Sequence, residues 1–362
     1  MFLMKETTIK AASHSYPVYI GENLRHQTAQ YFHKDYSSIL IITDETVADC
    51  YLSDVKNSLA HENVFSYVIQ AGEKAKSIDT FYQLHTQAIE CGLDRQSLMI
   101  ALGGGVVGDV AGFAAATFMR GIDFIQMPTT ILAHDSSVGG KVAINHEQGK
   151  NMIGSFYAPA GVIYDVQTLH SLPDHEIRSG YAELLKEALL ADVDLYQLLI
   201  SNDLSVLSSQ DLSYKLQRGI EIKAGIVEID ERESGIRKHL NLGHTLGHAL
   251  ESLLGYGYQT HGELVALGLL FAFRVSEKKF TPELPFEQLY TWLKRNGYPL
   301  NMPFIKPEEI LAKMKKDKKT LRTEIQMVLL KSMAQPVLME INDESLLEYL
   351  EDFQTELAQR NS

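Results

Sequence analysis

The stretch Leu98-Met-Ile-Ala-Leu-Gly-Gly-Gly-Val-Val-Gly-Asp109 decides the fold of the first half of the chain. It opens with an apolar run of buried-strand length, continues into glycines and leads into a helical pattern. Gly103, Gly105 and Gly108 match G-x-G-x-x-G in this strand–turn–helix context. Without side chains the backbone can approach a pyrophosphate, and a helix N-terminus supplies oriented N–H groups. The stretch therefore predicts a nucleotide-binding loop, with a closely packed tight turn as the alternative.

Further apolar runs of similar length lie on either side of this strand. They are Ile39–Thr43, Val64–Ile69 and Phe124–Met127. Between them, Ser77–Glu90 has the length and period of a helix, and Thr7–Ala11 with Tyr16–Ile20 at the start of the chain indicates a hairpin. Short apolar runs separated by helices are typical of a parallel sheet that is covered on both faces.

The second half of the chain has a mostly helical period. The clearest predicted helices are Arg178–Leu199, Leu212–Val227, Leu240–Leu254, Gly262–Lys278 and Asp343–Leu357. Glu324–Leu330 and Val337–Ile341 predict a pair of strands. We therefore expect an α/β nucleotide-binding domain with a mostly parallel sheet over residues 1–171, and a mainly α-helical domain over residues 172–362.

Composition limits the class of protein. The 33 Lys and Arg residues against 46 Asp and Glu residues give a net charge of −13, which argues against general binding to nucleic acid or to acidic membranes. Two cysteines in 362 residues cannot support a disulfide framework. No uncharged run approaches the roughly 20 residues that span a bilayer. We expect a soluble, cytoplasmic protein without a membrane partner.

The acid that usually follows a dinucleotide loop is missing. It is expected about 20 residues after the loop, where this chain has Pro128, Thr129 and Thr130. Asp44 instead ends an earlier strand. Its carboxylate can accept hydrogen bonds from ribose hydroxyls, or it can cap the helix that follows.

A histidine pattern marks the helical half. In Asn241-Leu-Gly-His-Thr-Leu-Gly-His248, a continuous helix places Asn241, His244 and His248 on one face. Histidines at i and i+4 have metal-ligand spacing. Thr245 stands where zinc peptidases carry Glu, which argues against peptidase chemistry.

Further candidate ligands lie on neighbouring predicted helices. His261 begins the next apolar helix, and Glu183 and Lys186 share a face at i and i+3. One Glu with two or three His can form an open metal site that leaves a position for a substrate oxygen. Structural or surface histidines are the alternative.

Basic residues accompany these motifs. The set consists of Lys141, Lys150, Lys186, Lys223, Arg237, Lys318 and Lys319. Lysines on glycine loops and beside candidate metal ligands suggest capture of a phosphate or carboxylate, whereas each lysine alone is typical of a solvated surface. Together the motifs indicate a nucleotide, a divalent metal and an anionic substrate between the two halves. A metal beside a nicotinamide suggests oxidation of an alcohol.

The motifs, taken in order from about Thr43 to Leu330, closely resemble the 3-dehydroquinate synthase family. The segments that carry the resemblance are Gly103–Asp109, Arg120-Gly121, Pro128–Thr130, Asp135–Lys141, Gly149–Asn151, Gly180–Lys186, Leu240–His248, His261–Glu263 and Asp317–Lys319. The resemblance implies one site that converts 3-deoxy-D-arabino-heptulosonate 7-phosphate to 3-dehydroquinate and phosphate in the shikimate pathway. The implied steps are oxidation, phosphate elimination, reduction, ring opening and aldol closure, with NAD used catalytically and zinc or cobalt as the metal.

The resemblance also implies roles for individual residues. Glu183, His244 and His261 match the metal ligands, whereas His248 matches a residue near the substrate. The implied substrate contacts are Asp135, Lys141, Asn151, Lys186, Lys223, Arg237, Asn241 and one lysine of Lys318-Lys319, taken as Lys318. The implied NAD region comprises Asp44, Gly72, Glu73, Lys76, Gly105, Val106, Val107, Gly108, Asp109, Thr129, Thr130, Lys141, Lys150, Thr168, Leu169, His170 and Ser171. Arg120 matches an arginine that reaches into the partner subunit's site, which implies a homodimer.

The chain departs from the family pattern in one segment, and the proposed reaction has alternatives. The segment Ile131-Leu-Ala-His134 is one residue shorter than the family pattern and places His134 where apolar residues are usual. The nearest alternative is another sugar-phosphate cyclase that makes an inosose or valiolone ring, but Arg237 and Asn241 with the lysines favour a carboxylated substrate. More distant alternatives are a metal-dependent polyol dehydrogenase and a nucleotide-binding module without turnover.

Overall fold

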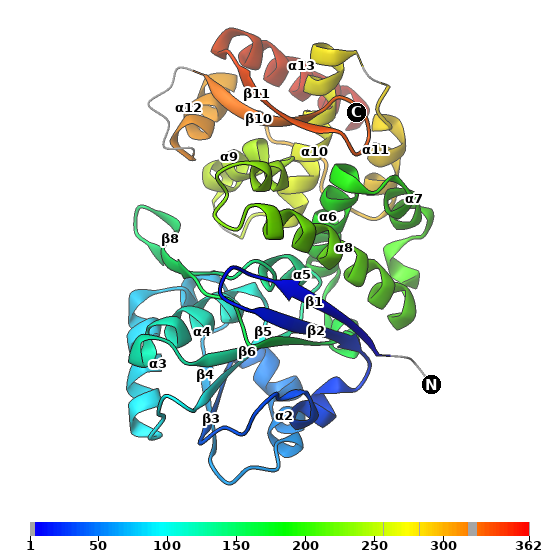
Figure 1. The fold of residues 1–362 in the computed structure, drawn as a ribbon. Helices are drawn as coiled ribbons and strands as arrows, with labels where there is room; N and C mark the ends of the chain where they lie inside the picture. Colours follow the sequence, from blue (N-terminus) through cyan, green and yellow to red (C-terminus); the bar gives the residue numbers. More distant parts are fainter. Residues whose placement is uncertain (1–3, 256, 282, 318–323, 362) are drawn as a thin grey trace. The chain divides into compact units, whose positions relative to one another are not determined.

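The computed structural model describes residues 4–255, 257–281, 283–317 and 324–361. The chain divides into two compact units (Figure 1), one formed by residues 1–172 with 208–232 and the other by residues 173–207 with 233–362. The first break lies next to the boundary expected from sequence. Residues 208–232 return to the first unit, because α8 (Ser209–Ile229) packs against β1 and α5.

A seven-stranded sheet forms the centre of the first unit. In spatial order its strands are β1 (Lys5–Lys10), β2 (Ser15–Gly21), β9 (Gly161–Asp165), β6 (Asp123–Pro128), β5 (Leu98–Gly103), β3 (Ile39–Asp44) and β4 (Val64–Ile69). The β1–β2 pair is antiparallel and the other neighbouring pairs are parallel. The predicted mostly parallel sheet is confirmed, and β9 is a strand that the sequence analysis missed.

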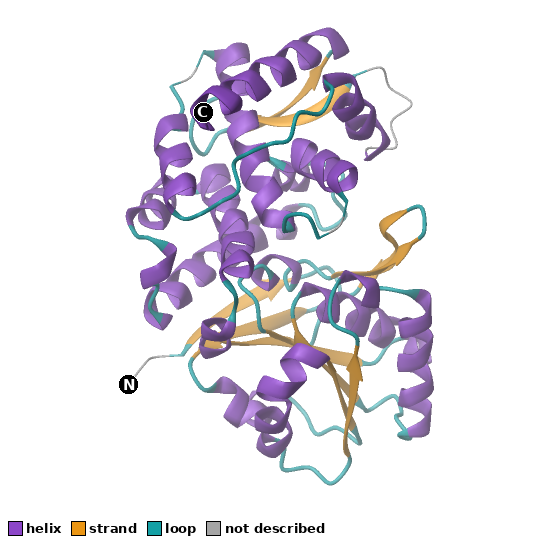
Figure 2. Cartoon of the chain, turned by 180° about the vertical axis from the view of Figure 1, so that it is seen from behind, coloured by secondary structure: helices purple, strands orange, loops and turns teal. Residues whose placement is uncertain are grey.

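Helices cover both faces of this sheet (Figure 2). On β3, Leu40 and Ile42 pack into a core with α3 (Ile78–Glu90) and α4 (Gly105–Thr117). The alternate residues Ile39 and Ile41 pack into a second core, which also contains residues of η1 (Leu24–Tyr31) and α2 (Ser53–Ser58). Because successive side chains point to opposite faces, burial of both faces explains why this strand reads as a continuous apolar run.

Short elements connect the strands of the first unit. The helical segments are α1 (Glu45–Val47), η2 (Ala48–Leu52), η3 (Glu73–Ala75), η4 (Phe118–Arg120), α5 (Ala133–Ser136) and η5 (Val166–Ser171). A separate antiparallel hairpin consists of β7 (Lys141–His146) and β8 (Gly149–Phe156).

The second unit is mainly helical, as predicted. Its elements are α6 (Asp174–Ala191), α7 (Val193–Ser201), η6 (Leu204–Val206), η7 (Ile236–Asn241), α9 (His244–Leu254), α10 (His261–Phe280), α11 (Phe286–Arg295), α12 (Pro307–Asp317), β10 (Ile325–Leu330), β11 (Pro336–Ile341) and α13 (Asp343–Asn361). The predicted strand pair is present as β10 and β11. Helix α10 is central, because it packs against α6, α9, α11, α13 and β10.

Two predicted helices differ from the observed ones. The expected helix Arg178–Leu199 is interrupted at Asp192, which leaves the helical conformation and accepts a hydrogen bond from Leu195 N at 2.9 Å. The expected helix Leu240–Leu254 begins only at His244, because Gly243 takes the left-handed conformation with φ +80°. Asn241 therefore ends the preceding 3₁₀ turn and does not share a helix face with His244 and His248, so this part of the prediction is wrong.

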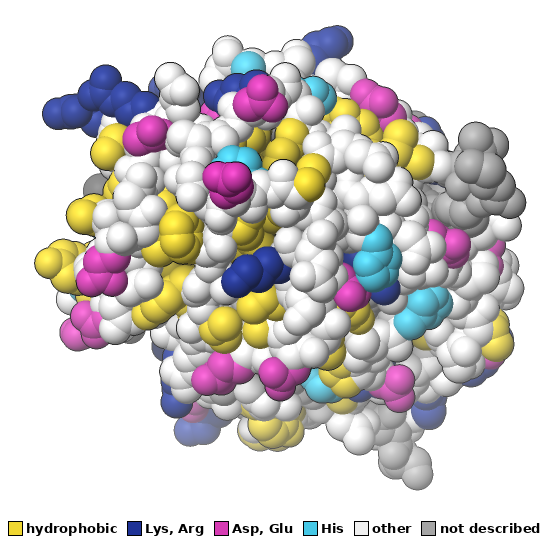
Figure 3. All heavy atoms as spheres, turned by 90° about the horizontal axis from the view of Figure 1, so that it is seen from below, with side chains coloured by type: hydrophobic (Ala, Val, Ile, Leu, Met, Phe, Trp, Pro, Cys, Tyr) yellow, Lys and Arg dark blue, Asp and Glu magenta, His cyan; other side chains and the backbone are white. Residues whose placement is uncertain are grey.

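Two features concern the partners of the chain: the length of its apolar helices and the distribution of charged side chains on its surface. Among the helices that the structure describes, none is long and apolar enough to span a membrane. On the face shown in Figure 3, Lys and Arg side chains are interspersed with Asp, Glu and His, and no continuous basic patch is visible on that face.

Two glycines allow α10 to approach its neighbours closely. A Cβ added at Gly262 would lie 1.9 Å from the carbonyl oxygen of Ser179 on α6. A Cβ at Gly268 would lie 1.8 Å from the carbonyl oxygen of Gly243, directly before α9. These backbone contacts leave no space for a methyl group, so they set the spacing of the three helices α6, α9 and α10.

We predict that Gly268→Ala lowers the free energy of unfolding by about 3 kcal/mol, because a backbone atom must move to admit the methyl group. The matched control is Gly225→Ala within α8, where an added Cβ meets nothing within 4 Å. The control is expected to stabilise the chain by about 0.5–1 kcal/mol through its helix propensity. Urea unfolding of both variants checks this, and equal effects of the two substitutions would contradict the close approach.

Candidate active site

The glycine loop has the predicted strand–turn–helix geometry. Helix α4 begins at Gly105, with Gly104 as its N-cap residue. A Cβ at Gly103 would lie 2.6 Å from Val107, and one at Gly108 would lie 2.9 Å from Gln126 Oε1. Packing inside the first unit therefore already favours glycine at position 103, in agreement with the tight-turn alternative, whereas at position 108 the contacting atom is the end of a flexible side chain. The helix N-terminus that a phosphate needs is present as well.

Other residues of the implied NAD region have local structural contacts. Asp44 Oδ1 accepts a hydrogen bond from Val47 N at 3.0 Å, which confirms the helix-cap interpretation of Asp44. Thr168, Leu169, His170 and Ser171 lie in η5. Tyr51 donates to Ser171 Oγ at 2.7 Å and anchors the end of this segment.

Lys76 connects two of the predicted residues. Its ammonium lies 2.6 Å from Asp109 Oδ2 and also donates to Asn151 Oδ1. The Lys76 side chain is 5% exposed and that of Asp109 is 18% exposed. Burial raises the pKa of the Asp109 carboxyl above its ordinary value, although Lys76 opposes the shift. The pair therefore fixes the first turns of α4 beside the β7–β8 hairpin.

Asn145 completes this cluster. Its amide donates to Glu73 Oε1 at 2.8 Å, and its own side-chain oxygen accepts from Asn151 N at 2.9 Å. Lys150 Nζ lies 3.8 Å from the same Glu73 oxygen. Sequence reasoning missed Asn145, because its contacts arise from the pairing of β7 with β8 and from no spacing along the chain.

A second ion pair of the first unit joins Asp135 and Lys223. Lys223 Nζ on α8 lies 3.0 Å from Asp135 Oδ2 on α5, and the Lys223 side chain is 7% exposed. The adjacent His134 is fully buried, and its Nδ1 lies 2.5 Å from the carbonyl oxygen of Ile131. The shortened segment therefore accommodates a histidine through a backbone hydrogen bond. Lys141, the first residue of β7, is exposed.

The second unit gathers ionisable side chains around Glu183. Glu183 on α6 is 1% exposed, and its Oε1 lies 3.3 Å from Nε2 of His244 and 3.3 Å from Nε2 of His261. The other oxygen, Oε2, lies 2.6 Å from Lys186 Nζ. Burial would raise the pKa of the Glu183 carboxyl, but Lys186 and His244 outweigh burial and hold the pKa well below its usual range. Glu183 is therefore a carboxylate.

The pKa values of the two imidazoles are shifted in opposite directions. Burial lowers the pKa of His244 despite the nearby carboxylate of Glu183. Burial acts in the same direction on His261, but Glu183 and Glu251 raise the pKa of His261 to about 9. A histidine binds a metal through a neutral ring nitrogen, so a bound cation would take the place of the proton that this cluster attracts.

His248 adds a third imidazole. Its ring centroid lies 5.1 Å from that of His244 and 5.6 Å from that of His261. Ligand atoms of the three histidines lie within 4.8 Å of one another, which is close enough to surround one ion. The structure thus brings together all four candidate donors, and two ligand sets fit: the three histidines, or Glu183 with His244 and His261.

The remaining predicted residues of the second unit lie near η7. The Arg237 side chain is buried, with 2% exposure. Asn241 donates to Glu233 Oε1 at 2.9 Å. Glu233 was missed, since it lies eight residues before Asn241 in an irregular segment and belongs to no periodic pattern. Lys318 and Lys319 lie outside the described residues.

The start of α10 holds His261 in place. Thr260 and Glu263 form a capping box around the first turn, and Arg178 Nε donates to Glu263 Oε1 at 2.7 Å. The amide of Gly262 donates to Ser179 Oγ at 3.1 Å. The backbone of His261 is therefore tied to α6, which also carries Glu183.

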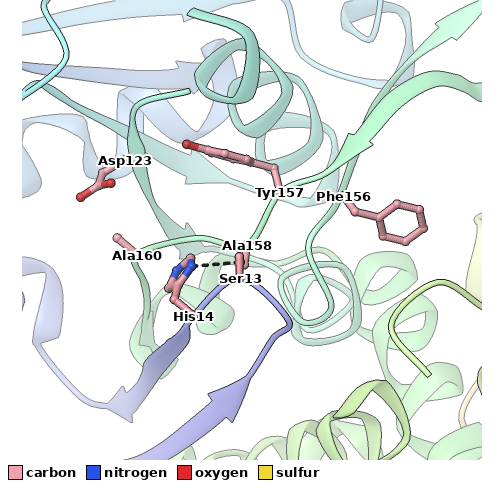
Figure 4. Close-up of a pocket in the computed structure, with 7 residues that line it drawn as sticks. All are labelled: Ser13, His14, Asp123, Phe156, Tyr157, Ala158 and Ala160. Atoms are coloured by element: carbon pink, nitrogen blue, oxygen red, sulfur yellow. Dashed lines mark hydrogen bonds between the residues drawn. The ribbon is translucent and has the colours of Figure 1, made fainter. Parts of the chain in front are cut away.

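A shallow hollow of the first unit has no part in this arrangement (Figure 4). It is lined by Ser13, His14, Asp123, Phe156, Tyr157, Ala158 and Ala160. Both ring nitrogens of His14 are engaged, one by Ser13 Oγ at 3.0 Å and the other by the Pro159 carbonyl at 2.9 Å. None of the predicted site residues lines this hollow.

The chain thus combines an α/β unit that carries a glycine loop with a helical unit that carries a buried ionisable cluster. Comparison with known proteins identifies the class. Residues 66–179 match the family model for the N-terminal part of 3-dehydroquinate synthase, and residues 180–320 match the model for its C-terminal part.

Relatives extend this match over nearly the whole chain. A 3-dehydroquinate synthase of Oceanobacillus iheyensis is 54% identical over 353 residues, which cover 97% of this chain and 98% of that protein. The corresponding protein of Geobacillus thermodenitrificans is 47% identical, with coverage of 97% and 98%. A crystal structure of 2-deoxy-scyllo-inosose synthase with carbaglucose-6-phosphate, NAD+ and Co2+ has a TM-score of 0.88 at 28% identity, with coverage of 96% and 99%. The chain belongs to the 3-dehydroquinate synthase family.

We predict that Asp109→Asn lowers the free energy of unfolding by about 2 kcal/mol, because Lys76 then keeps a nearly buried charge without its carboxylate. The control is Glu73→Gln, which removes the carboxylate from the more exposed pair with Lys150 and is expected to cost less than about 1 kcal/mol. Thermal unfolding of both variants measures the difference. A change at Glu73 as large as that at Asp109 would show that the Lys76–Asp109 pair does not stabilise the unit.

Proposed function

We propose that this chain converts 3-deoxy-D-arabino-heptulosonate 7-phosphate to 3-dehydroquinate and phosphate, with NAD and a divalent cation. Family membership supports the reaction. The observation that carries the chemistry is Glu183 Oε1 at 3.3 Å from Nε2 of both His244 and His261. One buried carboxylate oxygen with two imidazole nitrogens is a ligand set that zinc or cobalt accepts, and it leaves room for a substrate oxygen.

The two cofactors would supply the redox chemistry. When bound, the cation would supply polarisation of the C5 oxygen of the substrate, and NAD would supply a reversible acceptor for the C5 hydride. In our proposal Glu183, His244 and His261 hold the cation. The glycine loop and the cluster around Lys76 contribute to the NAD site. Oxidation at C5 acidifies the neighbouring C–H bond, so phosphate can leave by elimination, with its own oxygens able to take the proton.

The residues of the chain mainly orient and neutralise the substrate. We assign Lys141, Lys223, Lys186 and Arg237 to its carboxylate and phosphate, because cations offset that negative charge. Lys186 and Arg237 are each 2% exposed, and charges that are kept from water act more strongly than solvated ones. The partners Asp135 and Glu183 hold Lys223 and Lys186 in defined positions.

Further parts of the proposal concern assembly and location. Arg120 is exposed, with a left-handed φ of +70°, and it follows Met119 at φ +48°. We assign this turn to contact with the partner subunit of a homodimer. A phosphorylated sugar acid and NAD do not cross membranes unaided, so the proposal places the enzyme in the cytoplasm.

We predict release of inorganic phosphate from the heptulosonate phosphate with trace NAD and zinc, and loss of that release after chelation. Glucose 6-phosphate and sedoheptulose 7-phosphate are expected to react far more slowly, because they lack the carboxylate. A phosphate assay with all three substrates, run beside NADH absorbance, checks this. Stoichiometric accumulation of NADH would indicate a polyol dehydrogenase, and preference for either other sugar would indicate a different cyclase.

The ligand set makes a separate prediction. His244→Ala is expected to weaken zinc binding by more than the ~100-fold that loss of an outer contact costs, whereas His248→Ala retains zinc and loses turnover. Glu183→Ala should also lose zinc. Because this substitution leaves Lys186 buried without its carboxylate, the variant is also expected to unfold at a lower temperature. Metal analysis after gel filtration, with circular dichroism as the folding control, measures this. Loss of zinc in His248→Ala with retention in Glu183→Ala would establish the three-histidine set instead.

A further inference from the structure

Both imidazoles that face Glu183 have an oxygen atom close to their second ring nitrogen. His244 Nδ1 lies 3.1 Å from the carbonyl oxygen of Leu242, while its Nε2 faces Glu183. His261 Nδ1 lies 3.5 Å from Glu251 Oε2, while its Nε2 faces Glu183 at 3.3 Å. The two rings thus have the same orientation: each has an oxygen atom near Nδ1, and each directs Nε2 at Glu183.

This arrangement is the one that metal-binding histidines need. A ligating imidazole usually donates its other N–H to a carboxylate or a backbone carbonyl, and this contact fixes both the tautomer and the ring orientation. For His244 the acceptor is part of the main chain and cannot be removed by substitution. For His261 the acceptor is a side chain, so its contribution can be measured.

Glu251 is well placed for this task. It lies on α9, seven residues after His244 and three after His248, and its side chain is 14% exposed. The His261 side chain is 30% exposed against 12% for His244, so packing confines the His261 ring less. An orienting acceptor therefore matters more for His261.

We propose that Glu251 is a positioning residue that accepts a hydrogen bond from His261 Nδ1–H and so presents Nε2 to the divalent cation. This inference rests on the proposed metal site. Glu251 acts through His261 and is not itself one of the three proposed ligands. The carboxylate also makes the imidazole a stronger donor to a cation.

The test measures the zinc affinity of the full-length chain by competition with a chelator of known affinity. Glu251→Ala is expected to bind zinc about 10–100-fold more weakly than the unsubstituted chain, the range found for lost outer contacts. Glu251→Gln keeps an oxygen that can accept from Nδ1–H, so it should recover most of this loss. The matched control, Glu277→Gln, removes a carboxylate that pairs with Arg274 on the same α10 as His261 and should leave zinc affinity unchanged.

Thermal unfolding of the metal-free variants separates positioning from structure. The proposal expects similar melting temperatures for metal-free Glu251→Ala and the unsubstituted chain, with the difference appearing only when zinc is added. Zinc affinity of Glu251→Ala within twofold of the unsubstituted chain would overturn the proposal. The proposal would also be overturned if Glu251→Gln bound zinc as weakly as Glu251→Ala and both metal-free variants lost the same amount of thermal stability. An unsubstituted chain that binds no zinc would instead refute the metal site on which the inference rests.

Discussion

The buried carboxylate of Glu183 is the interaction on which the rest of the second unit depends. A charged group that is 1% exposed is costly unless it is paired. One oxygen is paired with Lys186 and the other faces His244 and His261. The arrangement leaves a carboxylate and two imidazole nitrogens directed at a common point. Such buried polar groups stabilise a protein core poorly, but their converging ligand atoms suit a bound cation.

Helix packing creates this arrangement. Glu183 comes from α6, whereas His244 and His261 come from the consecutive helices α9 and α10, which lie much further along the chain. They meet because α10 contacts its neighbours backbone to backbone, at Gly262 and Gly268. The capping box at Thr260 and the hydrogen bonds to Arg178 and Ser179 then fix the first turn of α10, where His261 stands. The geometry of the site therefore depends on glycine at positions 262 and 268, where a side chain would push the helices apart, as well as on the ligands themselves.

Periodicity predicted most of the fold, but β9 was missed, and helix boundaries were wrong where a single residue interrupts a pattern. Strands such as β3 and β5 are recognisable because burial on both faces leaves continuous apolar runs. The break at Asp192 and the late start of α9 after Gly243 leave the apolar period intact, so period alone could not locate them. The residue pattern already offered Glu183 as a candidate ligand together with two or three histidines, and the resemblance to a family then selected His244 with His261 in place of His244 with His248. Glu251 could have been predicted from the sequence, because it follows His248 by one helical turn on the same helix face. Glu233 and Asn145 depend on irregular or paired segments and carry no such signal.

The most direct test is a crystal structure of the zinc-loaded chain, with anomalous scattering recorded at the zinc edge. The account predicts one anomalous peak about 2.0–2.2 Å from a Glu183 oxygen and from Nε2 of both His244 and His261. A peak coordinated by the three histidines without Glu183, or a fully loaded chain with zinc bound elsewhere, would contradict it.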